Sequence, residues 1–440
     1  MSSAQRLIAL LVALLVVAAV VVVGLNVGGR PGEAVASSSP SASSSAPASP
    51  ASTGATATVE ATPDPSAPSD AEALAILTAI EEQVEAIRGL PPADIGAPEL
   101  ITREELRGEL QQIFDEEYPP EERERDNLTL RAFGLLGPDE DVAELQLQLL
   151  GEGVLGFYDD TDQRMVVVTD SGIDAVAKLT YAHEYTHALQ DAAFGLDSLE
   201  TDAVGEDDRG LARTALIEGD ANTVMFAWAF AHLTQAEILE LQGIPLPDTT
   251  GIPSWMVAQL DFPYAFGQSW VSELAGGDLL APDFTEVDAA YADAPTSTEQ
   301  VIDIAKWYDR EEPMPVELPD LAVALGDGWE EVDTSPVGQA TISIILEFFG
   351  AAPDEAGFAA DGWGGDRATV VMGPGDDFAL VWRLAWDSSA DAGEFADAYG
   401  SVVEALPFPA SVRELPGGDV LVVHASTDAV HDAALDAAGG

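Results

Sequence analysis

The first 70 residues of the chain cannot contribute to a globular core. Arg6 precedes a run without polar side chains from Leu7 to Leu25, which as a helix would extend about 28 Å, close to the thickness of a bilayer core. The tract from 28 to 70 is rich in Ser, Ala, Pro and Thr and contains no aromatic residue. It cannot bury enough apolar surface to offset its chain entropy. The folded part is therefore confined to residues 71–440.

The apolar run predicts a membrane anchor rather than a cleaved signal peptide. No small-residue cleavage site follows it closely, because Ala34-Val35-Ala36 lies well downstream. We therefore expect residues 1–27 to form an N-terminal transmembrane helix and residues 28–70 to form a disordered stalk. A stalk between an anchor and a folded part favours export. The expected location is the cell membrane, single-pass, with the bulk of the chain extracytoplasmic.

Charge and cysteine content exclude several classes of function. The chain has 78 acidic and 17 basic residues, for a formal net charge of -61, so phosphate backbones would be repelled and nucleic-acid binding is not expected. Cysteine is absent, which excludes disulfides, thiol catalysis and zinc sites built on thiolates. A surface this acidic suits a cation-rich exterior, where counterions screen the repulsion between its charges.

Patterning indicates an α+β fold with two parts, a mainly helical domain over 71–320 and a small α+β region over 321–440. Turn residues Asp159–Asp162 join two predicted strands into a β-hairpin. In the C-terminal part, Gly362–Arg367 is interpreted as a glycine-rich turn and Arg367 as a structural salt-bridge partner rather than a substrate ligand. Helices are predicted at Glu72–Ile87, Thr102–Glu116, Ile173–Phe194, Arg209–Leu239 and Asp391–Ala405, and strands at Gly153–Tyr158, Met165–Val168, Ala368–Met372, Phe378–Trp386 and Val420–His424.

The predicted helix around residue 185 carries a pattern suited to metal chemistry. It contains His183-Glu184-Tyr185-Thr186-His187, in a chain with only five histidines. Histidines four apart lie on one helix face, so both imidazoles can reach a single tetrahedral Zn²⁺. Glu184 is rotated by about 100° and can take a proton from a zinc-bound water and pass it to a leaving amine. The alternative is a pair of buried or exposed structural histidines.

A catalytic zinc needs a third protein ligand, and the following helix offers one. Glu218 stands in the segment Ala215–Asn222, after a loop from Gly195 to Asp208 that lets the helix return antiparallel. Small side chains at Gly219 and Ala221 would allow the two helices to approach closely. Glu218 is the preferred third ligand, with Asp220 and Glu206 as rivals.

These residues resemble the gluzincin zinc metallopeptidases. In that group two histidines and a glutamate from the next helix hold zinc, and the hairpin before the motif helix is similar to its edge strand. The resemblance implies a zincin-like domain with His183, His187 and Glu218 as ligands and Glu184 as general base. Further stretches look like a poorly characterised bacterial family of predicted gluzincins: Gly156–Asp159, His187–Asp191, Ser297–Gln300 and Gly362–Arg367.

The sequence departs from the gluzincin pattern at one position. Members often place Asp four residues after the ligand glutamate, where it orients a ligand histidine, and here Asn222 stands there. Asn accepts a weaker hydrogen bond from imidazole than a carboxylate does. Asp191, one turn beyond His187, either supplies the missing charge or is a solvated acid at the helix end.

Peptide hydrolysis also needs a donor for the developing oxyanion. Tyr264 is the preferred candidate because it stands in an aromatic-rich segment, with Tyr291 and Tyr308 as alternatives. His232 lies about 21 Å from Glu218 along an unbroken helix and is judged too distant.

The sequence therefore predicts a membrane-anchored, zinc-dependent metallopeptidase acting on a protein or peptide substrate. One alternative is a catalytically degenerate zincin-fold surface module that binds a protein partner. Another is a zinc hydrolase acting on a non-peptide bond. The role of residues 321–440 is left unassigned.

Overall fold

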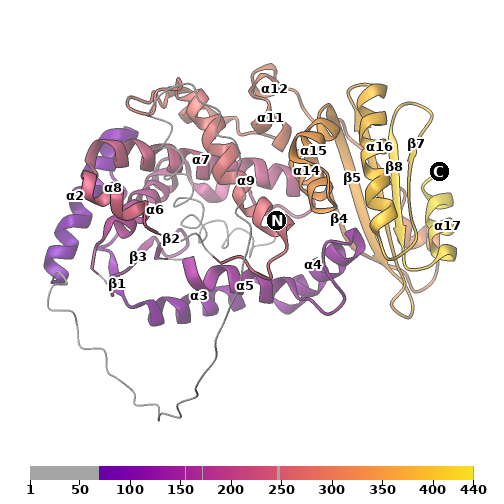
Figure 1. Ribbon diagram of the computed structural model, residues 1–440, viewed down its shortest axis with the longest axis horizontal. Helices are drawn as coiled ribbons and strands as arrows, with labels where there is room; N and C mark the ends of the chain where they lie inside the picture. Colours follow the sequence, from indigo (N-terminus) through magenta and orange to yellow (C-terminus); the bar gives the residue numbers. More distant parts are fainter. Residues whose placement is uncertain (1–68, 154, 171, 245–247, 440) are drawn as a thin grey trace, which may run out of the picture.

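The computed structural model describes residues 69–153, 155–170, 172–244 and 248–439. The fold is α+β and mainly helical, with two small sheets, as the sequence predicts (Figure 1). The predicted anchor at 1–27 and all but the end of the predicted stalk at 28–70 lie outside these residues. Within the described part of the chain, no helix combines the length and the apolar character needed to cross a membrane.

The first helices are defined by caps that the sequence carries. Helix α2 (Asp70–Arg88) follows a Ser69–Glu72 capping box, and α3 (Arg103–Glu117) follows one between Thr102 and Glu105. Both predicted helices are confirmed within two residues. Pro119 and Pro120 follow α3, and Pro120 is the first residue of the next helix, because Pro is well suited to a first helical turn. Helices α4 (Pro120–Phe133) and α5 (Val142–Gly153) complete this segment.

The predicted hairpin exists as part of a three-stranded sheet. Strands β2 (Gly156–Asp159) and β3 (Arg164–Val168) pair antiparallel, so the prediction that a strand starts at Gly153 is wrong by three residues: Gly153 still belongs to α5. Strand β1 (Glu99–Ile101) pairs parallel with β3 and was missed, giving the order β1-β3-β2. Edge strand β2 thus keeps one side free to meet the following helices.

The motif helix and its successor are buried along most of their length. Helix α6 (Ala175–Phe194) starts at an Asp174 cap and ends at Gly195, as predicted. A 3₁₀ turn, η1 (Leu196–Leu199), leads to α7 (Asp207–His232). The prediction of one helix over Arg209–Leu239 is wrong. A new cap at Thr234, which donates its backbone N–H to Glu237, starts a separate helix α8 (Gln235–Leu241).

Helix α9 (Ser254–Leu274) crosses α7 at a contact between two glycines. A Cβ on Gly219 would lie 2.3 Å from the carbonyl oxygen of Gly267, and one on Gly267 would lie 2.2 Å from that of Ala215. The small residue at Gly219 therefore permits close approach of α9, not of the motif helix as expected. Short helices α10 (Thr285–Ala292), α11 (Thr298–Ile302) and α12 (Ile304–Asp309) follow.

The C-terminal region is built on a five-stranded antiparallel sheet of order β4-β5-β6-β8-β7. The predicted strands and the predicted helix are present. The glycine-rich turn predicted at Gly362–Arg367 is wrong from Trp363 on: Gly362 lies in a turn, whereas Trp363–Arg367 open β5, which pairs with β6. The elements are α13 (Leu321–Leu325), β4 (Glu330–Ser335), α14 (Gly338–Phe348), α15 (Pro353–Ala360), β5 (Trp363–Met372), β6 (Phe378–Trp386), α16 (Ser389–Ala405), β7 (Ala410–Glu414), β8 (Val420–Ala425) and α17 (Asp428–Ala437).

Glycines in β5 allow the extended segment at Met314 to lie close against the strand. Met314 donates its backbone N–H to the carbonyl of Gly364, and a Cβ on Gly365 would lie 2.3 Å from the Met314 carbonyl oxygen. Arg367 makes no ion pair within the described residues. It donates instead to the Gly205 carbonyl at 3.1 Å. The predicted salt bridge is therefore wrong, and Arg367 has a structural role through this hydrogen bond to the backbone.

Three apolar cores hold the chain together. The first gathers α2, α6, α7 and α9, and the third lies between the five-stranded sheet, α13 and α17. The second joins α3–α5 to the other face of that sheet, where the rings of Phe133 and Trp382 lie 5.8 Å apart. Figure 1 shows α4 reaching the sheet. The regions 71–320 and 321–440 therefore share a core.

Candidate metal centre

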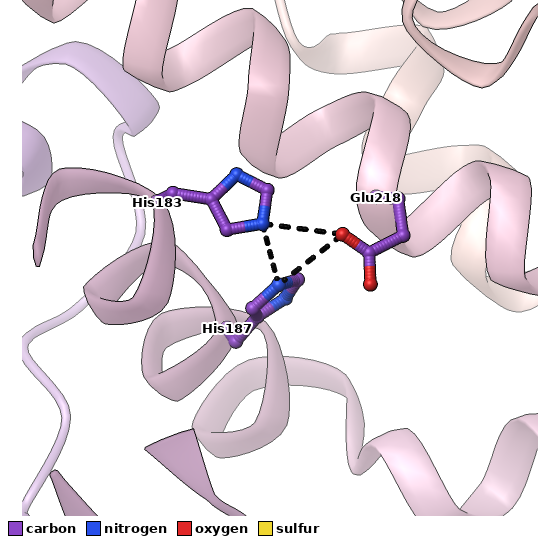
Figure 2. Close-up of side chains that lie close together, drawn as sticks. All are labelled: His183, His187 and Glu218. Carbon is purple, nitrogen blue, oxygen red and sulfur yellow. Dashed lines mark hydrogen bonds and ion pairs between the residues drawn. The ribbon is translucent and has the colours of Figure 1, made fainter. Parts of the chain in front are cut away.

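Three predicted ligands converge at one point between α6 and α7. The Nε2 atoms of His183 and His187 lie 3.0 Å apart. The Oε2 atom of Glu218 lies 3.1 Å from the first and 3.5 Å from the second. Figure 2 shows the two imidazoles of α6 and the carboxylate of α7 pointing toward one another. All three side chains are at most 1% exposed.

The separations fit a metal ion. Donors about 2.0–2.1 Å from a tetrahedral zinc stand roughly 3.3 Å from each other, and the three observed separations of 3.0, 3.1 and 3.5 Å bracket that value. The second oxygen of Glu218 is buried without a hydrogen-bond partner among the described residues. Two imidazole nitrogens and one carboxylate oxygen form a donor set typical of catalytic zinc.

The electrostatics of the three side chains favour a cation between them. Burial alone would raise the pKa of Glu218, but His187 and His183 hold it at about 2. Burial disfavours the charged form of His187, yet the Glu218 and Glu184 carboxyls raise its pKa to about 9. Burial lowers the pKa of His183. The Glu218 carboxylate is thus anionic and favours a positive charge beside it. A divalent cation would supply that charge.

Glu184 lies beside the three donors but is not one of them. It follows His183 on α6 and is 2% exposed. Its Oε2 accepts the backbone N–H of Tyr158 at 3.0 Å, so edge strand β2 fixes the carboxyl. Burial raises the pKa of Glu184 to about 8. A carboxyl with a raised pKa beside a metal donor set has the properties of a general base.

Of the three tyrosines considered, the structure brings only Tyr264 to this point. It lies on α9, its ring is 6.2 Å from that of His183, and its buried hydroxyl has no hydrogen-bond partner among the described residues. Burial, with the nearby Glu218 and Glu184, raises its pKa, so the hydroxyl keeps its proton. Tyr291 donates to Asp220 and Tyr308 donates to Glu286. His232 is exposed at the end of α7, as expected.

The rival ligands have other partners. Asp220 is paired with Arg88, whose Nε lies 2.9 Å from its Oδ1. Glu206 precedes α7 and lies 3.8 Å from Arg209. Asp191 accepts from the hydroxyl of Tyr158 and from a backbone N–H after α6. Asp191 therefore caps the C-terminal end of α6. The interpretation of Asp191 as a charged partner of His187 is wrong.

One ligand histidine is oriented by a carboxamide instead: Nδ1 of His187 lies 2.8 Å from Oε1 of Gln190. Asn222 donates to the backbone carbonyl of Tyr264 at 3.3 Å. Its Oδ1 and the Nδ1 of His183 are buried without a hydrogen-bond partner among the described residues. The position where gluzincins often place Asp thus retains an acceptor. Gln190 has a sequence signal, since it lies one turn after His187.

Comparisons with known proteins identify only the C-terminal region. Residues 325–434 match a family described as a domain of unknown function, DUF8575. This segment runs from the end of α13 into α17 and contains the whole five-stranded sheet. No curated protein and no solved structure matches the chain.

Proposed function

We propose that the chain is a zinc-dependent metallopeptidase of the gluzincin type, with a zincin-like fold around α6 and α7. The observation that carries the proposal is the convergence of His183 Nε2, His187 Nε2 and Glu218 Oε2 within 3.5 Å of one another. These donors would hold Zn²⁺. When bound, zinc supplies a Lewis acid that polarises a substrate carbonyl and makes water more acidic.

The remaining steps are assigned to side chains of this chain. Glu184, held by the N–H of Tyr158, takes a proton from the attacking water and passes it to the leaving amine. The hydroxyl of Tyr264, which has no partner among the described residues, donates to the carbonyl oxygen as negative charge develops. Glu184 is on α6 and is held by strand β2, and Tyr264 is on α9, which packs against α7, so their positions are fixed before substrate binds.

The proposed location follows from the N-terminal sequence. An apolar run long enough for a bilayer and a low-complexity tract precede the folded part. We place the peptidase outside the cytoplasm, tethered by residues 1–27, with a protein or peptide as substrate.

A second candidate is a catalytically inactive module of the same fold that binds a protein partner. One observation favours it: the three ligands, Glu184 and Tyr264 are each at most 2% exposed. A peptide reaches such a site only if a covering segment moves. An inactive module has no such requirement.

Metal content and glutamate-dependent cleavage distinguish the two candidates. The full chain, purified without chelators, is expected to carry one zinc and to cleave members of a peptide library. Glu184→Gln is expected to retain zinc and to lose about 10²- to 10⁴-fold in rate. Stoichiometric zinc with no cleavage by the wild type would support the inactive module, and absence of bound zinc would refute both.

A further inference from the structure

The hydrogen bonds around Gln190 determine which nitrogen of His187 carries a proton. Nε2 of Gln190 lies 3.0 Å from the carbonyl oxygen of Ile217 and 3.1 Å from Oδ2 of Asp220. Both are acceptors, so the amide nitrogen must face them and Oε1 must face His187. Nδ1 of His187 therefore donates, and Nε2 keeps the free lone pair that a metal ligand needs.

Asp220 is held in turn by an arginine from another helix. Nε of Arg88 lies 2.9 and 3.1 Å from the two oxygens of Asp220, and neither side chain is exposed. Arg88 also contacts Asp288 at 2.7 Å and lies 4.5 Å from the ring of Phe284. Tyr291 donates a further hydrogen bond to Asp220. A buried carboxylate without its counter-charge is costly, so Arg88 makes this acceptor possible.

Arg88 is the last residue of α2, which packs against both metal-site helices. The hydroxyl of Tyr185 on α6 donates to Glu85, and Trp228 on α7 donates to Gln83. Helix α2 is thus fixed on two sides, and its final residue enters the space between α6 and α7. No metal donor comes from α2, so its contribution to the centre is indirect.

From these contacts we infer that Arg88 is a positioning residue for the metal centre. Through Asp220 and Gln190 it fixes the tautomer and the ring orientation of His187. The inference deepens the proposed function and rests on it for the role of the metal, but its first consequence concerns the histidine alone. Losing the direct hydrogen-bond partner of a metal-ligating histidine typically costs about 10- to 100-fold in metal affinity, which is the largest effect expected from Arg88.

The test uses the full chain with Arg88→Met and Asp220→Ala combined, so that no uncompensated charge is left buried. Two readouts are measured: the zinc dissociation constant by competition with a chromophoric chelator, and the His187 tautomer by nuclear magnetic resonance of ¹⁵N-histidine-labelled protein. We expect zinc binding to weaken by up to about 10- to 100-fold, and we expect a mixture of tautomers in the metal-free chain at alkaline pH, where His187 is neutral. Lys178→Gln is the matched control. Lys178 is on α6, as His187 is, and the change breaks its ion pair with Glu237 of α8. It should change neither readout.

Arg88→Lys keeps the charge pair and should restore both readouts close to wild type. Should the double variant fail to fold, Gln190→Met decides, since it removes the partner of His187 without touching a charge. An unchanged tautomer and an unchanged zinc affinity in either variant would overturn the inference. A chain whose His187 tautomer depends on Arg88 but that cleaves no peptide refutes only the proposed function. Glu184-dependent cleavage with no dependence on Arg88 refutes only the positioning role.

Discussion

The α6–α7–α9 region and the five-stranded sheet bury the same types of polar side chain with different outcomes. In the sheet region, His424 donates from Nδ1 to the Ala132 carbonyl and accepts from Tyr399 at Nε2. Asp366 accepts four hydrogen bonds, two from backbone N–H groups and two from indoles. Around α6, by contrast, the second oxygen of Glu218 and the hydroxyl of Tyr264 have no partner among the described residues.

The difference shows what distinguishes a structural polar group from a functional one. Burial is the same in both regions, since His187 and His424 are each 0% exposed. Native structures satisfy nearly all buried polar atoms, so several unsatisfied atoms around one point indicate a place for an ion, a water or a ligand. The imidazoles of His183 and His187 face each other and the Glu218 carboxylate. Both ring nitrogens of His424 are instead hydrogen-bonded, one to the Ala132 carbonyl and one to the Tyr399 hydroxyl.

The largest expected effect comes from replacing one buried carboxylate in each region by the amide of the same shape. Glu184→Gln should reduce peptidase rate by about 10²- to 10⁴-fold and leave stability nearly unchanged. Asp366→Asn should lower the free energy of unfolding by about 1–3 kcal/mol, because an amide group then faces donors, and leave the rate unchanged. Turnover and denaturant unfolding of both variants check this. Equal effects of the two changes on rate would break the comparison.

Zinc should stabilise the chain only through the α6–α7 donors. At free zinc 100 times the dissociation constant, binding to the folded state adds about 2.7 kcal/mol to the free energy of unfolding. We expect this gain in the wild type and in His232→Ala, whose side chain is exposed, and its loss in His187→Ala. Thermal unfolding with and without zinc measures it. A gain that persists in His187→Ala would place the ion elsewhere.

The pH dependence of His424 should mark it as structural. Burial lowers its pKa from 6.5 to about 4, so the folded state holds it neutral. The associated stability is present above pH 6.5 and is lost as pH falls toward 4, amounting to about 2 kcal/mol by pH 5. Unfolding of the wild type and of His424→Gln, compared at pH 7 and pH 5, should show the smaller loss in the variant. Identical losses would show that His424 does not titrate on unfolding.

A glycine-to-alanine pair gives the smallest effects, of opposite sign. At Gly219 the added methyl group would lie 2.3 Å from the Gly267 carbonyl oxygen, so α9 must shift at a cost of about 1–3 kcal/mol. At Gly400 in α16 nothing lies within 4 Å, so alanine should add about 0.5–1 kcal/mol through its higher helix propensity. Chemical denaturation of both variants checks the signs. Stabilisation by Gly219→Ala would contradict the close crossing of α7 and α9.

The parts of the fold and the site that local patterns encode could be predicted. Helical periodicity located α2, α3 and α6, and the spacing of His183 and His187 defined two donors before any coordinates were known. Glu218 followed from its place on the next helix. Strand β1, with only three residues after a proline-containing loop, offers no period to detect.

Contacts between distant segments were beyond the sequence. Arg88 and Asp220 are 132 residues apart, and nothing local distinguishes this arginine from the others. Gly219 was correctly taken as a close-contact position, but the partner helix could not be known from one helix alone. The glycines of β5 were interpreted as a turn because the segment at Met314 that packs against them is far away in the chain.

Zinc K-edge X-ray absorption of the full chain tests the central claim most directly. The account predicts one zinc per chain with two imidazole nitrogens and carboxylate oxygen at about 2.0–2.2 Å, and loss of the imidazole signal when His183 and His187 are replaced by alanine. A chain that takes up no zinc, or a spectrum without histidine ligands, would contradict it.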